Sequence, residues 1–397
     1  MRRTFAFALA LVVLLSSSAV AVPVAGPTYA QVEPVVPADN TTAYLTIAEG
    51  NVERTGYGIA SLDVAATLSA QNDGLHARLN SLTLEERLAT AGSEEERQII
   101  IQSEADQLTA EVNALEKRKL DALSAYNSGD LTSDQLLREL ATIWMVATAL
   151  EDRVDTVESA ADDITRSRIA KGISLARASL LELQGPIREH SALVVEGRAT
   201  PRTVYLETSD SAIVLVTIAG DEYVREVSVP SARNPTAPDQ YDGDLDKVES
   251  RAEELHPWAL ENSRSRNYGS PELGFVGIYP FQFPHSQGIL QSYLDGGTGE
   301  IFYEIQHKDL DEVPTNAPQT TTNDSLTLTV ETTHGSGPMN LTLVDADTGD
   351  PVDGTISING QQVATTGEDG TVWVIQPRDR GTVIASANGR SVRASVA

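Results

Sequence analysis

The sequence contains no cysteine, so disulfide bonds and thiolate chemistry are excluded. Lysine is scarce as well, with five lysines among the 29 basic residues, against 57 acidic residues. The resulting net charge of −28 repels the phosphate backbone of nucleic acids and also anionic membrane surfaces. We therefore expect no nucleic-acid partner. Self-repulsion of this size is tolerable where salt screens it, because the Debye length shrinks to about 3 Å at 1 M salt.

Catalytic motifs are also lacking. The chain has no G-x-S-x-G elbow, no Walker loop and no dinucleotide fingerprint. Its six histidines are far apart, and no two of them form an H-x-H or H-x-x-x-H pair. They are His76, His190, His256, His285, His307 and His334. We therefore predict no metal, no cofactor and no catalytic residue. A hydrolase whose carboxylates meet His256 or His285 only in the folded chain stays open as an alternative.

The N-terminus has the pattern of an export signal. A basic start (Arg2, Arg3) precedes an apolar run over residues 5–15, and Ala19-Val20-Ala21 fits a small-x-small cleavage site. Residues 1–21 are predicted to be a signal peptide, and residues 22–57 a flexible lead. If the signal is not cleaved, residues 4–25 are nearly long enough to anchor the chain in a membrane.

Residues 58–192 are predicted to be helical. Ser93 with Glu96, and Thr132 with Gln135, form capping boxes at two helix starts. After each box apolar residues recur every three or four positions, and turn formers at 126–130 separate the two runs. This pattern predicts an N-terminal all-α bundle containing an antiparallel coiled-coil hairpin. The hairpin is either a partner-binding spacer or part of a plain bundle.

Residues 200–310 are predicted to form an α+β domain with an antiparallel sheet. The period changes to two in three strands at 203–209, 212–220 and 222–230, and a helix (244–262) and a hairpin (289–308) follow. The D-x-x-T-G-E turn of that hairpin resembles the terminal hairpin of PepSY-type domains, which implies regulation or inhibition of an exported peptidase.

The stretch at 277–288 concentrates aromatic residues in a chain with only six phenylalanines. Tyr279, Phe281, Phe283 and His285 alternate there with two prolines. One hypothesis is an aromatic lip that binds a peptide or ligand. The alternative is an ordered loop that packs its rings over a sheet edge.

Residues 311–325 are rich in Pro, Thr and Asn and are predicted to be a linker. Residues 326–397 contain about seven short alternating runs, with Asn-Gly pairs at 359–360 and 388–389, which predicts a β-sandwich. Four aspartates lie at 345–353, but their spacing fails the EF-hand pattern and fits a turn.

The same C-terminal segment resembles the carboxypeptidase-regulatory or adhesin type of Ig-like domain. A first motif is matched by Asp345, Thr348, Gly349, Pro351, Val352 and Gly354, and a second by Thr366, Asp369 and Gly370. The resemblance implies a structural or adhesive module without catalytic residues.

The whole arrangement resembles the uncharacterised exported multidomain proteins of halophilic archaea. We expect an exported, non-enzymatic cell-surface or envelope protein that acts by protein–protein interaction or as a structural module. Its expected partners are other envelope or secreted proteins, with membrane contact only through an uncleaved signal segment. Glycosylation is predicted at the sequons of Asn40, Asn323 and Asn340.

Overall fold

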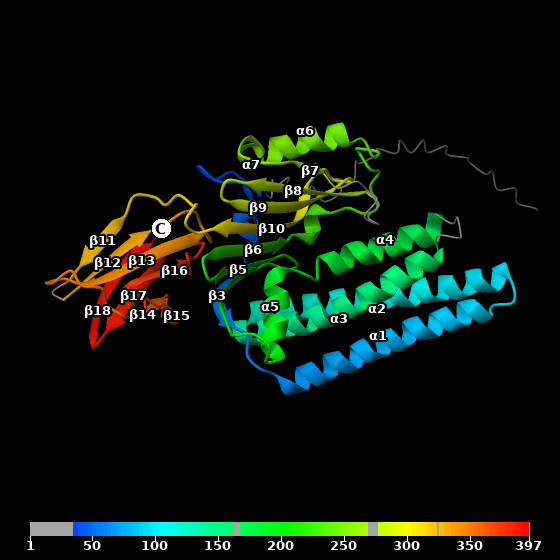
Figure 1. Cartoon of the computed structure of the whole chain (residues 1–397), viewed down its shortest axis with the longest axis horizontal. Helices are drawn as coiled ribbons and strands as arrows, with labels where there is room; N and C mark the ends of the chain where they lie inside the picture. Colours follow the sequence, from blue (N-terminus) through cyan, green and yellow to red (C-terminus); the bar gives the residue numbers. More distant parts are fainter. Residues whose placement is uncertain (1–34, 162–166, 269–276, 324, 397) are drawn as a thin grey trace, which may run out of the picture. The chain divides into compact units, whose positions relative to one another are not determined.

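The computed structural model describes residues 35–161, 167–268, 277–323 and 325–396. The predicted signal peptide therefore lies outside the described residues, as does the first part of the predicted lead. Within the described residues, the chain forms a helical region, an antiparallel sheet and a C-terminal pair of sheets (Figure 1). Among the helices of these residues, none is both long enough and apolar enough to span a membrane.

The helical region contains α1 (Val64–Thr90), α2 (Glu94–Ser128), α3 (Ser133–Ala161), α4 (Ser167–Leu181) and α5 (Pro186–Val195). The Thr132–Gln135 capping box is complete, and at the other predicted box the Glu96 carboxylate accepts the N–H of Gly92, one residue before Ser93. The Ser93 hydroxyl accepts a hydrogen bond from the Glu96 N–H, and Thr132 and Gln135 cap one another reciprocally. α2 ends at Gly129, whose φ of 90° lies in the left-handed region.

The apolar seams of α2 and α3 are buried in one shared cluster with residues of α1 and α4. The central seam residues are Ile101, Ala105, Leu108, Val112 and Leu115 on α2, and Ile143, Ala147, Leu150, Val154 and Val157 on α3. Burial of these side chains supplies the main stabilisation of the helices. The helical region is thus confirmed.

The central sheet has eight strands in the order β3-β4-β5-β6-β10-β9-β8-β7, and every pairing is antiparallel. The strands are β3 (Arg54–Ile59), β4 (Thr203–Thr208), β5 (Ile213–Ala219), β6 (Glu222–Ser228), β7 (Asn267–Tyr268), β8 (Ile278–His285), β9 (Gly288–Asp295) and β10 (Ile301–Asp309). The predicted antiparallel sheet is therefore confirmed.

Both faces of this sheet are covered. Alternate residues of β4 and β5, such as Leu206 and Leu215, share a cluster with Leu123, Leu137 and Ile187 of the helices. The residues between them, such as Tyr205 and Val216, belong to a cluster that includes α6 (Leu245–Leu255) and α7 (Pro257–Glu261). The central strands β4, β5 and β6 are therefore buried on two sides.

Part of the predicted flexible lead is ordered. Residues 35–59 contain β1 (Val35–Val36), β2 (Tyr44–Leu45), the short helix η1 (Glu49–Asn51) and the edge strand β3. Leu45, Ile47 and Tyr57 are buried in the core. The prediction of a flexible lead is therefore wrong for the described residues, because these side chains pack against strands that lie far away in the sequence.

The C-terminal part consists of two four-stranded sheets, ordered β11-β12-β13-β16 and β15-β14-β17-β18. Their strands are β11 (Gln319–Thr322), β12 (Leu326–Glu331), β13 (Pro338–Asp345), β14 (Thr355–Ile358), β15 (Gln361–Thr365), β16 (Thr371–Ile375), β17 (Gly381–Ala387) and β18 (Arg390–Val396). The predicted linker thus contains a paired strand, β11, because its threonines suit an edge strand.

The turns of this part follow the sequence signals. All four residues of the two Asn-Gly pairs have positive φ, as type I′ hairpin turns require. The aspartate-rich stretch forms a turn that its first residue, Asp345, stabilises: the Asp345 Oδ1 accepts hydrogen bonds from the N–H groups of Asp347 and Thr348. Its Oδ2 accepts a hydrogen bond from Arg390 at 2.8 Å.

Candidate functional site

The most unusual feature of the central sheet is a row of buried polar side chains. Arg225 on β6 and Glu304, Gln306 and Lys308 on β10 are each about 1% exposed. The antiparallel register places Gln306 opposite Arg225, and the period of two brings Glu304 and Lys308 to the same face. We call these four residues the polar row.

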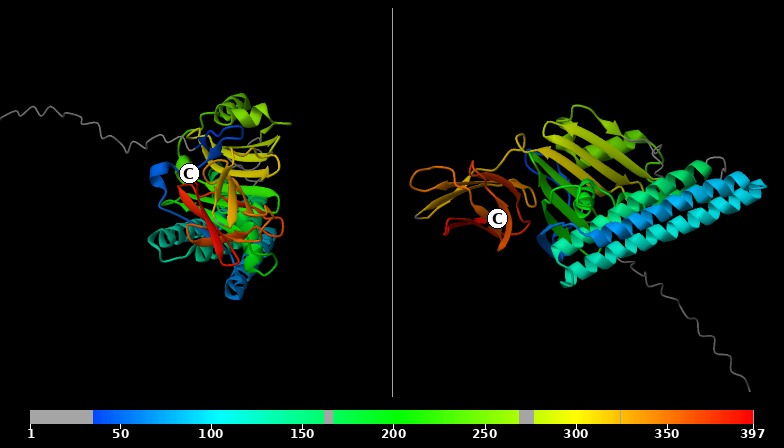
Figure 2. Two further views of the ribbon diagram at one scale, coloured as in Figure 1. Left: turned by 90° about the vertical axis from the view of Figure 1, so that its left-hand side faces the viewer. Right: turned by 60° about the horizontal axis from the view of Figure 1, so that its bottom comes forward.

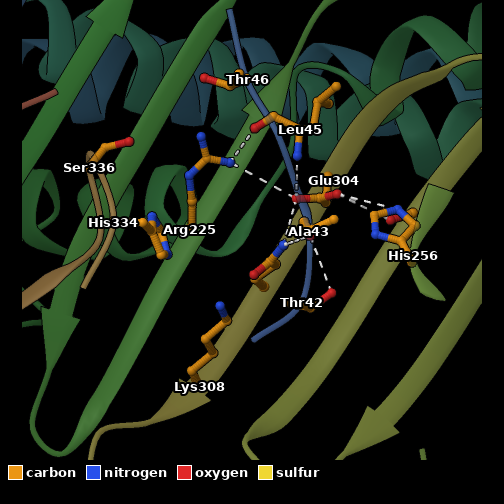
Figure 3. Close-up of polar contacts among 12 residues, drawn as sticks. Thr42, Ala43, Leu45, Thr46, Arg225, His256, Glu304, Lys308, His334 and Ser336 are labelled. Carbon is orange, nitrogen blue, oxygen red and sulfur yellow. Dashed lines mark hydrogen bonds and ion pairs between the residues drawn. The ribbon is translucent and has the colours of Figure 1, made fainter. Parts of the chain in front are cut away.

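Residues 41–47 cross over the polar row, and we call this segment the strap (Figure 3). The Glu304 carboxylate accepts the Leu45 N–H at 2.9 Å, and the Arg225 guanidinium donates to the Leu45 carbonyl at 2.5 Å. The Gln306 side-chain amide donates to the Ala43 carbonyl at 3.0 Å. Side chains of the sheet thus satisfy the backbone of an extended segment, much as a groove would bind a peptide.

The first residue of the strap is held by its side chain. Lys308 Nζ donates to the Thr41 hydroxyl at 2.8 Å, and that hydroxyl donates to Gln287 Oε1 at 2.6 Å. Gln287 then donates to the Asn40 carbonyl at 2.8 Å. This chain of hydrogen bonds ties the strap to the β8–β9 connection and gives the buried ammonium of Lys308 an acceptor.

The far end of the strap is held from the C-terminal part. Arg378, which follows β16, donates to the Thr46 hydroxyl at 3.1 Å, to the Ile47 carbonyl at 2.7 Å and to the Glu207 carboxylate at 2.9 Å. The ring of Tyr44 stacks on His334 with 4.6 Å between centroids. The strap is therefore bound both by the central sheet and by the connections β12–β13 and β16–β17 of the C-terminal part.

Burial dominates the electrostatics of the site. It raises the pKa of Glu304, against the opposing effect of the Arg225 guanidinium 4.0 Å away. It also lowers the pKa of Lys308 to about 7 and that of His256 to about 3. Each shift disfavours the charged form. The cluster is therefore costly to bury and depends on its mutual contacts.

Three side chains of the site, Ser292, His256 and Glu304, are of the types that carry nucleophilic catalysis. The Ser292 hydroxyl lies 3.5 Å from Glu304 Oε2, and His256 Nε2 lies 3.7 Å from the same oxygen. All three side chains are at most 1% exposed. A substrate has no access to a hydroxyl buried in this way beneath the strap, so the arrangement supports a structural role rather than nucleophilic catalysis.

The four residues of the predicted aromatic lip lie side by side in β8. Tyr279, Phe281, Phe283 and His285 all point to the buried face of the sheet and are at most 3% exposed. They therefore do not form an open lip, because alternation along a strand sends all four into the core. The alternative of an ordered loop is wrong in its secondary structure, because the stretch forms strand β8. The two prolines are tolerated there because β7 pairs only with Phe281 and Gln282, so neither proline takes part in that pairing.

The predicted glycosylation sites differ in accessibility. Asn40 and Asn323 are exposed, although the Asn323 side chain already bonds to the Ser391 carbonyl and to two backbone N–H groups. Asn340 is half-buried in β13 between Glu331 and Trp373 of the neighbouring strands. Exposed positions suit a glycan better, so Asn40 and Asn323 are better placed for one than Asn340.

The polar row is not among the predicted site residues, although the sequence carries a signal for it. In the stretches "EYVREVS" and "FYEIQHK", charged residues alternate with apolar ones inside predicted strands. Alternation of this kind ordinarily marks a solvated face. Here the polar phase is buried, because the strap and α6–α7 cover that face.

A second candidate site is an exposed apolar surface on α1. Leu68, Leu75, Leu79 and Leu82 are 55–63% exposed and recur at helical spacing, and we call them the leucine face. The buried residues of this helix, such as Leu84 and Leu88, lie on another side. Soluble monomers rarely expose a contiguous apolar patch without a use for it, so this face is a candidate interaction surface.

Comparison with known families divides the chain into three. A model described as a domain of unknown function (DUF7096) matches residues 1–200, and one described as a family of unknown function (DUF7094) matches residues 204–314. An archaeal fibronectin-III type-like domain matches residues 317–394, consistent with an Ig-like C-terminus in an archaeal multidomain protein. The expected PepSY resemblance finds no support among these matches.

Neither the curated proteins nor the solved structures contain a match to the chain. The first family model covers half of the sequence, so the chain belongs to the DUF7096 family.

Proposed function

We propose that this member of the DUF7096 family is an exported, non-enzymatic protein of the cell surface or envelope that acts through protein–protein contacts. Its export rests on the signal-like pattern of residues 1–21, and its acidic, lysine-poor composition favours a halophilic source. Within this proposal, α2 and α3 act as a coiled-coil hairpin that projects α1 as a binding surface.

The leucine face of α1 is the observation that carries the proposal. Four leucines of one helix stand in solvent, whereas the polar groups that could serve chemistry are covered. A chain of net charge −28 gains nothing from exposed leucines unless they are buried on a partner.

The closed polar row supports the same role. Its side chains are bound to the backbone of the strap rather than presented to a cavity, and the strap in turn contacts Arg378 and His334. This network suits a rigid support that holds a binding surface in a fixed orientation.

Two measurements test the proposal. In the cells that make the protein, protease added outside intact cells should digest it, and it should fractionate with the envelope or the medium. Cross-linking in that fraction with a photoreactive diazirine reagent should join α1 peptides to other chains, whereas a Leu75→Glu, Leu79→Glu variant should lose these cross-links. A cytosolic location, or cross-links that the variant retains, would refute the proposal.

A further inference from the structure

Over most of its length, α1 turns small or polar residues toward the bundle and leucines toward solvent, which is the reverse of an ordinary amphipathic helix. On the side turned to the bundle, Thr67 donates to the Val195 carbonyl at 3.2 Å, and Gly74 lies against Ala149. On the opposite side stand the four leucines of the leucine face. A helix that needed only its own bundle would turn the leucines inward, so the exposed side is built for another surface.

The spacing of the leucine face is that of a coiled-coil seam. Leu68, Leu75 and Leu82 lie seven residues apart, and Leu79 lies four residues after Leu75. These are alternate positions of one heptad pattern, the pattern that pairs one helix with another. The occupant is therefore a helix with a matching seam.

Charge favours a second copy of this chain as the source of that helix. Residues 64–84 contain one aspartate and one arginine, so this segment is neutral in a chain of net charge −28. Two copies can thus approach here without the repulsion that the rest of the acidic chain would produce. A cationic partner protein would gain nothing from a neutral segment.

The available area also fits a self-pairing interface. Four half-exposed leucines on each of two copies bring together on the order of 800 Å² of apolar surface. Contacts of the helix surface on either side of the seam increase the buried area, and specific interfaces begin at about 1,200 Å² of total buried area. A pair of copies related by a two-fold axis buries the same patch on both.

The direction of pairing follows from where the central sheet adjoins α1: its edge strand β3 directly precedes the helix, and the sheet lies toward the N-terminal end of α1 (Figure 2). The N-terminal end of α1 is tied to α5 by the Asp63 N–H, which donates to the Val195 carbonyl at 3.1 Å. α1 has 27 residues and is about 40 Å long. Antiparallel helices place the sheets of the two copies at opposite ends of the pair, which keeps the like charges of these parts apart.

We propose that two copies of the chain associate through antiparallel pairing of their α1 helices, with Leu75 of each copy packed against Leu79 of the other. This proposal rests on the interaction role proposed above and names the partner of the leucine face. Because apolar burial drives the pairing and self-repulsion opposes it, higher salt strengthens the dimer. We expect its dissociation constant to fall at least tenfold between 0.1 M and 1 M NaCl.

Sedimentation velocity of the purified full chain tests the pairing. At 1 M NaCl we expect a dimer, and the double variant Leu75→Glu, Leu79→Glu should sediment as a monomer with unchanged helical circular dichroism. The control Ile99→Glu, on α2 and 70% exposed, should stay dimeric. A wild-type monomer at every concentration overturns the proposal, and so does a dimer that persists in the double variant.

The absence of cysteine allows a direct test of direction. Leu75→Cys chains mixed with Leu79→Cys chains should form an inter-copy disulfide on mild oxidation, because the two positions face each other within disulfide reach. Neither variant alone should cross-link. Self-cross-linking of each variant alone would show parallel helices and contradict the proposal.

A cavity of about 350 Å³ between α1 and the neighbouring helices offers the leucines another destination. If α1 turned its leucines into this space, the wild type would be monomeric and both cysteine variants would be protected from thiol reagents. Both results would contradict self-pairing. These measurements use purified protein alone, so they fail or succeed separately from the envelope cross-linking that tests the proposed function.

Discussion

Replacing Glu304 with alanine perturbs the strap at its centre. The variant removes the acceptor of the Leu45 N–H, which costs about 1–3 kcal/mol when that donor is left buried and unpaired. It also removes the carboxylate beside Arg225, and an uncompensated buried guanidinium costs about 3–5 kcal/mol. The two losses share one cavity and do not add fully, and removing a buried carboxylate with a raised pKa recovers part of the cost.

We therefore expect Glu304→Ala to lower the free energy of unfolding by about 4 kcal/mol. Urea denaturation followed by tryptophan fluorescence measures this loss, since Trp258 lies close to His285 at the edge of the site. The strap should also become a site of early proteolysis, because its backbone loses a buried partner.

Glu222→Ala is the matched control. Glu222 lies on the strand next to β10 and pairs with His307 at 3.0 Å, but its side chain is 45% exposed. Surface pairs of this kind contribute under about 1 kcal/mol. If Glu304→Ala cost no more than Glu222→Ala, and the strap stayed resistant to protease, the reasoning about the polar row would be refuted.

Three further predictions concern buried polar groups. Lys308→Met should be neutral or stabilising at pH 7 in urea denaturation. Because the pKa of Lys308 is about 7 in the native state and about 10.5 in the unfolded state, the unfolded state holds more protons between these values, and wild-type stability should rise from pH 7 to 10.5. This rise should vanish in the variant. The pKa of His256 is about 3 in the native state and about 6.5 in the unfolded state, so between these values only the unfolded state binds the proton. The contribution of His256 should therefore lower the free energy of unfolding by about 2 kcal/mol as the pH falls from 6.5 to 5. His256→Phe should reduce that fall and the exposed control His76→Phe should not, and equal slopes for both would contradict the assignment. Thr366→Val should lower the free energy of unfolding by about 1–3 kcal/mol, and with it the melting temperature, because the buried Thr366 hydroxyl bridges a backbone carbonyl and a backbone N–H. Thr365→Val, at an exposed position, should have little effect.

Local patterns predicted local structure well. The helix caps at Ser93 and Thr132, the two Asn-Gly turns and the three strands after residue 200 depend on neighbouring residues, and the structure contains each of them. The alternation of apolar residues also indicated the antiparallel sheet. In each case the physical cause lies within about ten residues of the signal.

The strap and the polar row could not be derived in the same way. The burial of Leu45 and Ile47 depends on β6 and β10, which lie about 180 and 260 residues further along the chain. Glu304 and Lys308 resemble solvated strand residues until the segment that covers them is known. The stretch 277–288 is not predicted to be a strand because prolines usually exclude one. The position of β8 next to the edge strand of the sheet is what allows its two prolines.

Hydrogen exchange at the Leu45 amide tests the central claim most directly, because that claim states that the polar row binds the chain's own strap. In the native full-length protein, the account predicts that the Leu45 N–H exchanges as slowly as the amides of β6 and β10, and that Glu304→Ala abolishes this protection. Exchange of the Leu45 amide at the rate of an unstructured peptide would contradict the account.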